Sequence, residues 1–157
     1  MSADIKIRLA KTEDLKVIQD LNHELFLSDS QYQDGYNLNW PYEQAGEDYF
    51  KGVIAGELGV CFVAEADQEV VGYLAGCLRK PHAAFKTKRA ELENMYVKET
   101  MRSQGIGGRL AQTFLDWCKS KGAEHVIVGT LAGNDRAVKF YKAHGFDEFE
   151  IILRAKI

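Results

Sequence analysis

The chain has 157 residues, of which 46% are hydrophobic and 27% charged, and a formal net charge of −3. These values are typical of one compact globular domain, and they exclude a disordered, collagen-like or strongly basic nucleic-acid-binding chain. No run approaches the roughly 18 apolar residues that cross a bilayer. We therefore expect a single domain over residues 1–157, with no membrane or nucleic-acid partner.

The first part of the chain predicts one strand and two helices. Residues 5–10 alternate apolar and polar side chains, as a half-buried strand does. Thr12 is a good N-cap for a helix that runs to about Leu27. That helix has an apolar stripe at helical spacing, formed by Leu15, Ile18, Leu21 and Leu25. A polar loop over 28–41 follows, and a second helix is expected over about 42–54, where two glycines interrupt the pattern.

The rest of the chain predicts alternating strands and helices. Residues 59–66 and 69–78 are rich in strand-forming side chains, and the two polar residues between them are typical of a hairpin turn. Five further elements are expected in chain order: a strand over 90–97, a helix over 105–121, a strand over 125–130, a helix over 134–145 and a last strand over 148–157. The strand, helix, strand order in this half favours a locally parallel sheet.

The cysteines and histidines lack the spacing of a metal site. Cys61, Cys77 and Cys118 are odd in number, far apart and set in apolar runs, which suits buried thiols in a reducing compartment. The histidines also show no ligand spacing; they are His23, His82, His125 and His144. We therefore expect a cytoplasmic protein without a metal.

Three glycines fall among four positions in RSQGIGG, residues 102–108, where a helix must begin. A strained loop, a nucleotide-binding loop and an anion site all use such glycines. A dinucleotide site, and with it an oxidoreductase, is disfavoured because Leu110 stands where G-x-G-x-x-G needs its third glycine. The anion site stays open, since a diphosphate approaches a glycine main chain closely and accepts hydrogen bonds from the first helical turn. Arg102 would add a charged contact.

Two motifs resemble one family. Residues 97–108, V-K-E-T-M-R-S-Q-G-I-G-G, resemble the acyl-CoA pyrophosphate loop of the GNAT superfamily of N-acyltransferases, [RQ]-x-x-G-x-[GA] after a strand that ends in valine. Residues 134–146, N-D-R-A-V-K-F-Y-K-A-H-G-F, are similar to its N-x-x-A-x-x-[FL]-Y-x-x-x-G-F segment. The resemblance implies an α/β (α+β) single domain. Its mixed, twisted sheet would have about six or seven strands, about four flanking helices and a splay between the fourth and fifth strands.

The resemblance also implies acetyl-CoA as the acyl donor, with no metal. Backbone groups near the end of the strand over 90–97 would pair with the pantetheine arm as an added strand does. The residues expected to bind the cofactor are Met95, Tyr96, Val97, Arg102, Ser103, Gln104, Gly105, Ile106, Gly107, Gly108, Asn134 and Tyr141. Asn134 is also expected to cap the helix that it opens.

Acyl transfer to an amine needs a base, because an alkyl ammonium has a pKa of about 10.4, and an acid for the departing thiolate. Glu91 and Glu93 are two residues apart and share one face of a strand. The resemblance favours Glu93 as the base, with Glu91 or water alone as alternatives. It also favours Tyr141 as the general acid, whereas a tyrosine packed in the core is the other interpretation.

The resemblance implies that the two N-terminal helices and the loop between them form the acceptor side, and this part of the chain is rich in acidic residues. No lysine or arginine lies between Lys16 and Lys51, and this stretch contains Asp20, Glu24, Asp29, Asp34, Glu43, Glu47 and Asp48. Such a field favours a small cationic or polyamine-like amine, with cation–π contacts from Tyr32, Tyr36, Trp40 and Tyr42. A solvated acidic face is the alternative. The basic cluster over 79–89 would contact the cofactor 3′-phosphate, or would only keep a loop tip soluble.

The resemblance thus predicts an N-acetyltransferase that moves an acetyl group from acetyl-CoA to a primary amine by direct transfer in a ternary complex. Two alternatives stay open. One is a non-catalytic acyl-CoA sensor or interaction module of the same fold, and the other is an acetyltransferase that acts on a protein amine. Dimers are common in the family, so a homodimer is a further option.

Overall fold

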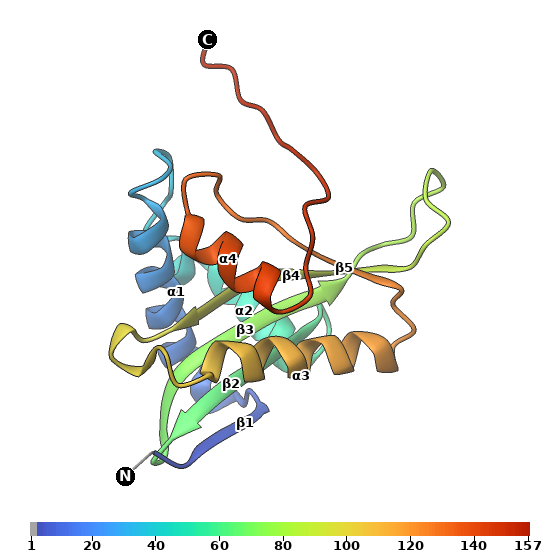
Figure 1. Cartoon of the computed structure of the whole chain (residues 1–157). Coiled ribbons are helices and arrows are strands. Elements are labelled where there is room, and N and C mark those ends of the chain that lie inside the picture. The colour runs from blue at the N-terminus through green and yellow to red at the C-terminus, as the bar shows by residue number, and fades with distance from the viewer. Residues whose placement is uncertain (1–2) are drawn as a thin grey trace.

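Five strands form one sheet in the order β1-β2-β3-β4-β5 in the computed structural model, which describes residues 3–157 (Figure 1). The strands are β1 (Ile5–Leu9), β2 (Val60–Ala66), β3 (Glu69–Leu78), β4 (Arg89–Val97) and β5 (His125–Val128). The helices are α1 (Leu15–Asp29), α2 (Gln44–Ala55), α3 (Ile106–Ser120) and α4 (Asp135–Ala143). The expected mixed fold is confirmed, although the sheet has fewer strands than the six or seven expected.

The strand pairing follows the sequence pattern. β1, β2, β3 and β4 pair antiparallel in chain order, and β4 pairs with β5 in parallel. Between β2 and β3, Asp67 and Gln68 have φ values of 49° and 68°, as a tight hairpin turn requires. The predicted hairpin and the locally parallel sheet are both confirmed.

The two faces of the sheet carry separate cores. Adjacent strand residues point to opposite faces, so Tyr73 of β3 joins the core under α1 and α2, whereas Leu74 joins the core under α3. Ile18 and Phe50 fill the first core, Phe114 fills the second, and all three are fully buried. Figure 1 shows α1 and α2 behind the sheet and α3 and α4 in front. Within residues 3–157, no helix combines the length and apolarity that a bilayer crossing requires.

Both N-terminal helices begin later than predicted, because each follows a short 3-10 turn. Residues Thr12–Asp14 form the first turn, and the Asp14 carboxylate, rather than Thr12, accepts from the Lys11 N–H at 2.7 Å. Residues Trp40–Tyr42 form the second turn ahead of α2. Gly46 lies inside α2, where its Cα packs against the backbone of that turn. This contact leaves no room for a Cβ, which explains why the position is a glycine.

The sheet opens between β4 and β5. Only residues Arg89–Leu92 of β4 pair with β5. On the β3 side, Ala75 pairs with Asn94 and Gly76 pairs with Leu92, so Glu93 is the extra residue of a β-bulge. Beyond the bulge, the β5-side edge of β4 has no strand partner among the residues that the structure describes. The predicted splay is therefore confirmed.

The predicted last strand over 148–157 is wrong. This segment contains no strand, and it runs away from the domain in an extended form (Figure 1). Its apolar side chains are exposed, and they include Phe149, Ile151, Ile152, Leu153 and Ile157. Alternating apolar residues make a strand only where a sheet edge accepts their backbone hydrogen bonds. Within residues 3–157 this segment pairs with no strand of the sheet.

The cysteines are free, as expected. Cys61 and Cys118 are buried and Cys77 is half-buried. Burial raises the pKa of the Cys118 thiol to about 12 and that of the Cys77 thiol to about 11. Thiols with such pKa values stay protonated at neutral pH and are weak nucleophiles.

Candidate active site

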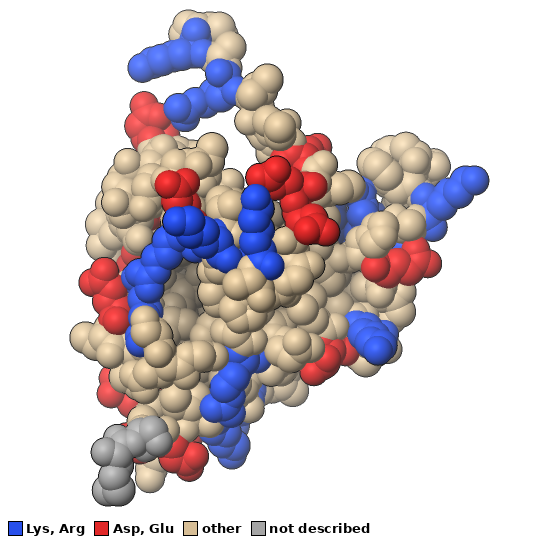
Figure 2. Space-filling view, viewed as in Figure 1, with Lys and Arg blue, Asp and Glu red and all other residues tan. Residues whose placement is uncertain are grey.

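A cleft of about 540 Å³ lies where α1, the end of β4, the loop ahead of α3 and α4 meet. Figure 2 shows a hollow in this part of the surface, bordered by Lys and Arg side chains. The structure brings together most of the residues predicted to bind the cofactor. Those that line the cleft are Met95, Tyr96, Val97, Arg102, Ser103, Gly105, Ile106, Gly107, Gly108, Asn134 and Tyr141.

The loop ahead of α3 forms a concave array of backbone N–H groups. Ser103 and Gly105 both have positive φ values, of 63° and 77°. No side chain caps α3, whose first backbone bond runs from the Arg109 N–H to the Gly105 carbonyl. The N–H groups of Ile106, Gly107 and Gly108 therefore have no helical partner. Unpaired donors with the positive end of the helix dipole form a site for an anion.

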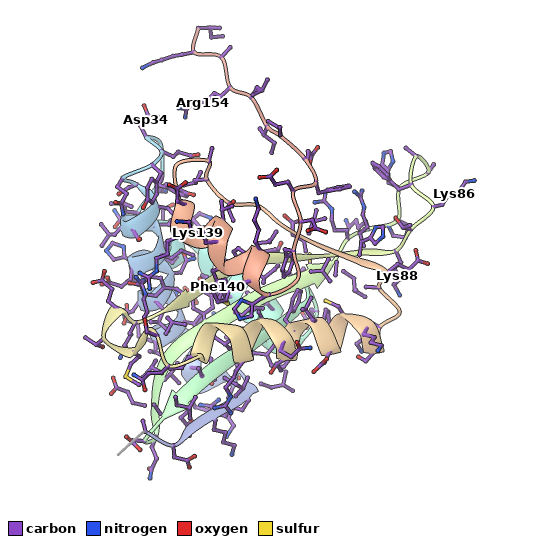
Figure 3. The ribbon with its side chains drawn as sticks, viewed as in Figure 1. Asp34, Lys86, Lys88, Lys139, Phe140 and Arg154 are labelled. Carbon is purple, nitrogen blue, oxygen red and sulfur yellow. The ribbon has the colours of Figure 1, made fainter. Side chains whose placement is uncertain are left out.

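The three glycines of this loop have different reasons to be glycine. Gly105 needs its positive φ, and a Cβ there would meet no atom within 4 Å. A Cβ on Gly107 would approach the Phe140 ring to 3.2 Å, and one on Gly108 would approach the His144 Nε2 to 2.6 Å. Figure 3 shows Phe140 between α4 and α3. Close packing of α4 thus explains Gly107 and Gly108, whereas the conformation and the open space at Gly105 leave room for a ligand.

Arg102 is fixed at the edge of the cleft by three contacts. Its Nε donates to the Val97 carbonyl at 3.0 Å, and its guanidinium lies 5.0 Å from the Tyr96 ring centroid. Its Nη1 is 3.8 Å from a Glu99 carboxylate oxygen. The bond to Val97 ties the loop to the free end of β4, so the loop and the strand edge are held as one unit.

Tyr141 on α4 lines the cleft, and its side chain is half-buried. Its ring packs edge-on against Phe140 and Phe146, with centroids 5.1 and 5.4 Å away. Burial raises the pKa of its hydroxyl, and the nearby Asp29 carboxylate raises it further. The hydroxyl therefore stays protonated at neutral pH. At the start of α4, the Asn134 side chain accepts from the Ala137 N–H at 3.1 Å, so the predicted N-cap is confirmed.

Glu93 lies outside the cleft, on the other face of the sheet. The Tyr49 hydroxyl of α2 donates to its Oε2 at 2.7 Å, and the Asn94 Nδ2 donates to that same hydroxyl at 3.0 Å. Burial and, secondly, the Glu93 carboxylate raise the pKa of Tyr49. The Asn94 Oδ1 is buried with no protein partner among the described residues. These groups lie at the β4 bulge, next to Leu92, where the pairing of β4 with β5 ends.

The alternative base, Glu91, is already paired. Its Oε2 accepts from the Arg79 Nη1 at 2.7 Å. Gln104, predicted to bind the cofactor, is the other predicted residue that does not line the cleft. Its amide lies 4.0 Å from the sulfur of Met101, which does line it. Of the two strand carboxylates, Glu93 is thus the one without a basic partner within 4 Å among residues 3–157.

The basic cluster over 79–89 is remote from the cleft. None of its residues lines it, and Figure 3 shows Lys86 and Lys88 on a projecting loop away from α4. Lys88 donates to the Lys121 carbonyl at 2.6 Å and so satisfies the end of α3. This position favours the solubility interpretation over a contact with the cofactor.

Sequence reasoning missed one face of α4. Arg136, Phe140 and His144 all line the cleft, and the His144 Nδ1 lies 2.7 Å from the Phe140 carbonyl. Their i, i+4, i+8 spacing places them on one side of a helix, so it was the signal that could have found them. Asp29 and Tyr32 also line the cleft. Burial raises the pKa of the Asp29 carboxyl.

Comparisons with known proteins agree with this geometry. The model of the acetyltransferase (GNAT) family matches residues 18–146. An uncharacterized N-acetyltransferase from Methanocaldococcus jannaschii is 29% identical over 104 residues, which are 66% of this chain and 46% of that protein. An uncharacterized N-acetyltransferase from Bacillus subtilis is 27% identical over 145 residues, which are 92% of this chain and 91% of that protein.

The same fold occurs in solved structures. An aminoglycoside N-acetyltransferase in complex with CoA superposes with a TM-score of 0.77 at 19% identity, covering 100% of this chain and 97% of that chain. At this identity the likeness shows the fold alone. The chain spans less than half of the length of some curated relatives, 46% for the archaeal protein.

Proposed function

Because the chain belongs to the GNAT acetyltransferase family, we propose that it transfers an acetyl group from acetyl-CoA to a primary amine, by direct transfer in a ternary complex. The observation that carries the proposal is the cleft itself. It combines the unpaired edge of β4, the uncapped start of α3 and the protonated Tyr141 hydroxyl. We also propose a cytoplasmic location, which the free thiols support.

The residues present fit an acyl-CoA. Open space at Gly105 and the unpartnered N–H groups of the first α3 turn suit a diphosphate, and Arg102 and Arg136 add positive charge. The edge of β4 from Asn94 to Val97 offers backbone groups to an amide-bearing arm, as a sheet edge does to an added strand. When bound, acetyl-CoA supplies a thioester whose carbonyl carbon is open to attack by an amine.

Tyr141 is the group that we assign to return a proton to the departing sulfur. A thiol has a pKa of about 8.5 and a tyrosine of about 10, so the phenol holds its proton at neutral pH. Burial raises the pKa of Tyr141 further. Its Oη–H is therefore a hydrogen-bond donor at every physiological pH, and a donor aimed at developing negative charge lowers the barrier.

Glu93 is the group that we assign to take the proton from the amine. The Tyr49 hydroxyl donates to its carboxylate, and the Asn94 amide donates to that hydroxyl and so holds it in place. Glu93 is the extra residue of the β4 bulge. Because Glu93 is exposed but lies outside the cleft, we assign the proton transfer to ordered water between the amine and the carboxylate rather than to direct contact. Glu91 is the weaker candidate, because its carboxylate is already engaged in the ion pair with Arg79.

We propose a small cationic amine as the acceptor. Asp29 and Tyr32 line the same cleft from α1 and the residues just after it. A half-buried carboxylate gains from a cationic partner, because burial alone raises its pKa. An aromatic face adds a cation–π contact. A lysine on a protein remains the second candidate, since an exposed chain amine has the same chemistry.

Calorimetric titration with acetyl-CoA tests the proposal, with two matched glycine variants. Gly105 and Gly145 both have positive φ, 77° and 90°, and both have open space around a would-be Cβ. Alanine at either position therefore adds similar backbone strain, of about 1 kcal/mol, but only Gly105 lines the cleft. We expect Gly105→Ala to weaken acetyl-CoA binding about tenfold or more and Gly145→Ala to leave it unchanged. Undetectable binding to the parent chain at millimolar acetyl-CoA would sink the proposal.

A non-catalytic acyl-CoA sensor is the alternative class. It would bind acetyl-CoA in the same cleft and release no thiol. Thioester consumption over a panel of amines separates the two, because only an acetyltransferase produces free coenzyme A in an amine-dependent way.

A further inference from the structure

The imidazole ring of His144 is held in one orientation on α4. Its Nδ1 lies 2.7 Å from the Phe140 carbonyl oxygen, and its ring packs on the Phe140 ring with centroids 4.3 Å apart. A carbonyl oxygen accepts hydrogen bonds and cannot donate, so Nδ1 carries a hydrogen in this contact. Nε2 has no hydrogen-bond partner among the residues that the structure describes. It is therefore the ring nitrogen that remains for a ligand.

This free nitrogen of His144 lies beside the first turn of α3. A Cβ on Gly108 would be 2.6 Å from Nε2, and Nε2 is the nearest atom of the ring. His144, Gly107 and Gly108 line the same cleft, and Figure 1 shows α4 next to α3 on one face of the sheet. The backbone N–H groups of this turn have no helical partner and form the anion site. Nε2 therefore borders the anion site.

The charges around this site leave a place for one more cation. The charged and titratable side chains that line the cleft with His144 are Asp29, Tyr32, Tyr96, Glu99, Arg102, Arg136 and Tyr141. The two arginines and the two carboxylates balance, so together they supply no net positive charge to a diphosphate. Other charged residues in the first turn of α3, in α4 and just after α4 do not line the cleft: Arg109, Lys139, Lys142, Asp147 and Glu148. A protonated His144 would supply the missing charge.

We propose that His144 binds the diphosphate of the acyl-CoA through Nε2 and takes up a proton from solvent as it does so. The inference rests on the proposed function, since it concerns the same ligand. In the neutral ring, Nε2 presents a lone pair, which repels the oxygens of a diphosphate. In the charged ring, Nε2–H donates to a phosphate oxygen, and Nδ1–H keeps its bond to the Phe140 carbonyl. Binding of the diphosphate and protonation of His144 therefore favour one another.

This coupling gives the pH dependence of binding a definite sign. A histidine side chain changes its charge between about pH 5 and 8, so affinity for the diphosphate should rise as the pH falls through this range. Two other groups also respond to pH. The 3′-phosphate of coenzyme A loses charge below about pH 6, and burial raises the pKa of the Asp29 carboxyl above its ordinary value. Dephospho-CoA, which lacks the 3′-phosphate, removes the first effect, and comparison with His144 variants removes the second.

Calorimetric titration with dephospho-CoA at about pH 5.5 and about pH 8 tests the proposal, because these values bracket the charge change of a histidine. The parent chain should bind about tenfold more tightly at the lower pH, as one charge-assisted hydrogen bond allows. His144→Phe keeps a ring on Phe140 but loses both nitrogens, so at either pH it should bind only as tightly as the parent does at the higher pH. His144→Arg keeps a positive charge at both pH values, so its affinity should stay high at both.

A matched histidine and a proton count keep the test specific. The His23 Nδ1 also lies 2.7 Å from a carbonyl oxygen, that of Leu38, but His23 does not line the cleft. His23→Phe should therefore keep the affinity and the pH dependence of the parent. Titrations in two buffers of different ionisation enthalpy count the protons taken up, and this number should be lower in His144→Phe than in the parent.

The outcomes separate this inference from the proposed function. Equal pH dependence and equal proton uptake in the parent and His144→Phe would overturn the inference and leave acetyl-CoA binding as proposed. A parent chain that binds neither acetyl-CoA nor dephospho-CoA would remove the proposed function and this inference together.

Discussion

The β2–β3 part of the sheet and its β5 edge differ in how completely they are buried. In β2 every residue but one is buried, and α1 and α2 both contribute fully buried side chains. In β5 no residue is buried, α4 has none either, and residues 148–157 are exposed. Stability is therefore concentrated around β2 and β3 and the helices that cover them. The β5 side includes α4, whose residues line the cleft.

The candidate site lies at the boundary of these two regions. Met95, Tyr96 and Val97 come from β4, whose end pairs with β3, whereas Asn134 and Tyr141 come from the cap and body of the open α4. A cleft between a rigid wall and a less constrained wall admits a long ligand without unfolding the domain. Mutations in the buried region should accordingly lower the free energy of unfolding, whereas mutations in the open region should lower turnover or ligand affinity.

The largest expected effect sharpens this contrast with one substitution in each region. Phe50→Ala removes a fully buried ring that contacts Trp40 and Tyr73, so it should lower the free energy of unfolding by about 3–5 kcal/mol. Phe149→Ala removes an exposed ring and should change it by less than about 0.5 kcal/mol in the monomer. Urea denaturation measures both values. Equal losses would break the comparison.

Tyr141→Phe separates chemistry from stability on the open side. Loss of the hydroxyl should lower turnover about 100-fold, the lower end of what a general acid contributes, and should leave acetyl-CoA affinity nearly unchanged. Because the pKa of Tyr141 is raised, the parent rate should show no loss from this group below about pH 10. Steady-state kinetics and calorimetry give the two readouts. An unchanged turnover would remove Tyr141 from the chemistry.

Asp14→Asn probes the ion pairs of the buried side. The Arg8 guanidinium bonds to the Asp14 carboxylate at 2.7 Å and holds its pKa below the ordinary value. Removing that charge should lower the free energy of unfolding by about 1–3 kcal/mol. The pH dependence has a definite sign. The stabilisation is present above the unfolded pKa of about 3.9 and is lost as the pH falls toward the lower folded value.

The matched control for Asp14 is Glu148. Its carboxylate also has a lowered pKa, from Lys142, but it is fully exposed. Glu148→Gln should leave the urea midpoint of the monomer unchanged between pH 3 and 7. A shift as large as that of Asp14→Asn would contradict the assignment of stability to the buried side.

Glu93→Gln should lower turnover by only about tenfold at neutral pH, less than Tyr141→Phe, because a water can still accept the proton. The rate should recover as the pH rises and free amine accumulates, so the pH–rate profile moves to higher pH. Tyr49→Phe removes the donor that holds the carboxylate and should move the profile in the same direction by less. Superimposable profiles for Glu93→Gln and the parent would assign the base to water or Glu91.

Much of this architecture is readable from local patterns. An apolar stripe located the first helix, and capping and glycine signals located helices at the other three places. The later starts of α1 and α2 come from short turns such as Thr12–Asp14. The last strand failed because alternation describes a side-chain pattern and says nothing of whether a sheet edge is available. The Tyr49–Glu93 bond joins residues 44 positions apart, and such a contact has no local signal. Likewise, the packing reason for Gly107 and Gly108 depends on α4, which follows much later in the chain.

Release of free coenzyme A is the measurement that tests the proposed function most directly. The parent chain is incubated with acetyl-CoA and a panel of small cationic amines, polyamines and lysine peptides, and new thiol is followed with a thiol reagent. We predict amine-dependent thiol release that is greatest with a cationic small amine and is reduced about 100-fold in Tyr141→Phe. Binding of acetyl-CoA with no thiol release for any amine would contradict the account and identify a sensor.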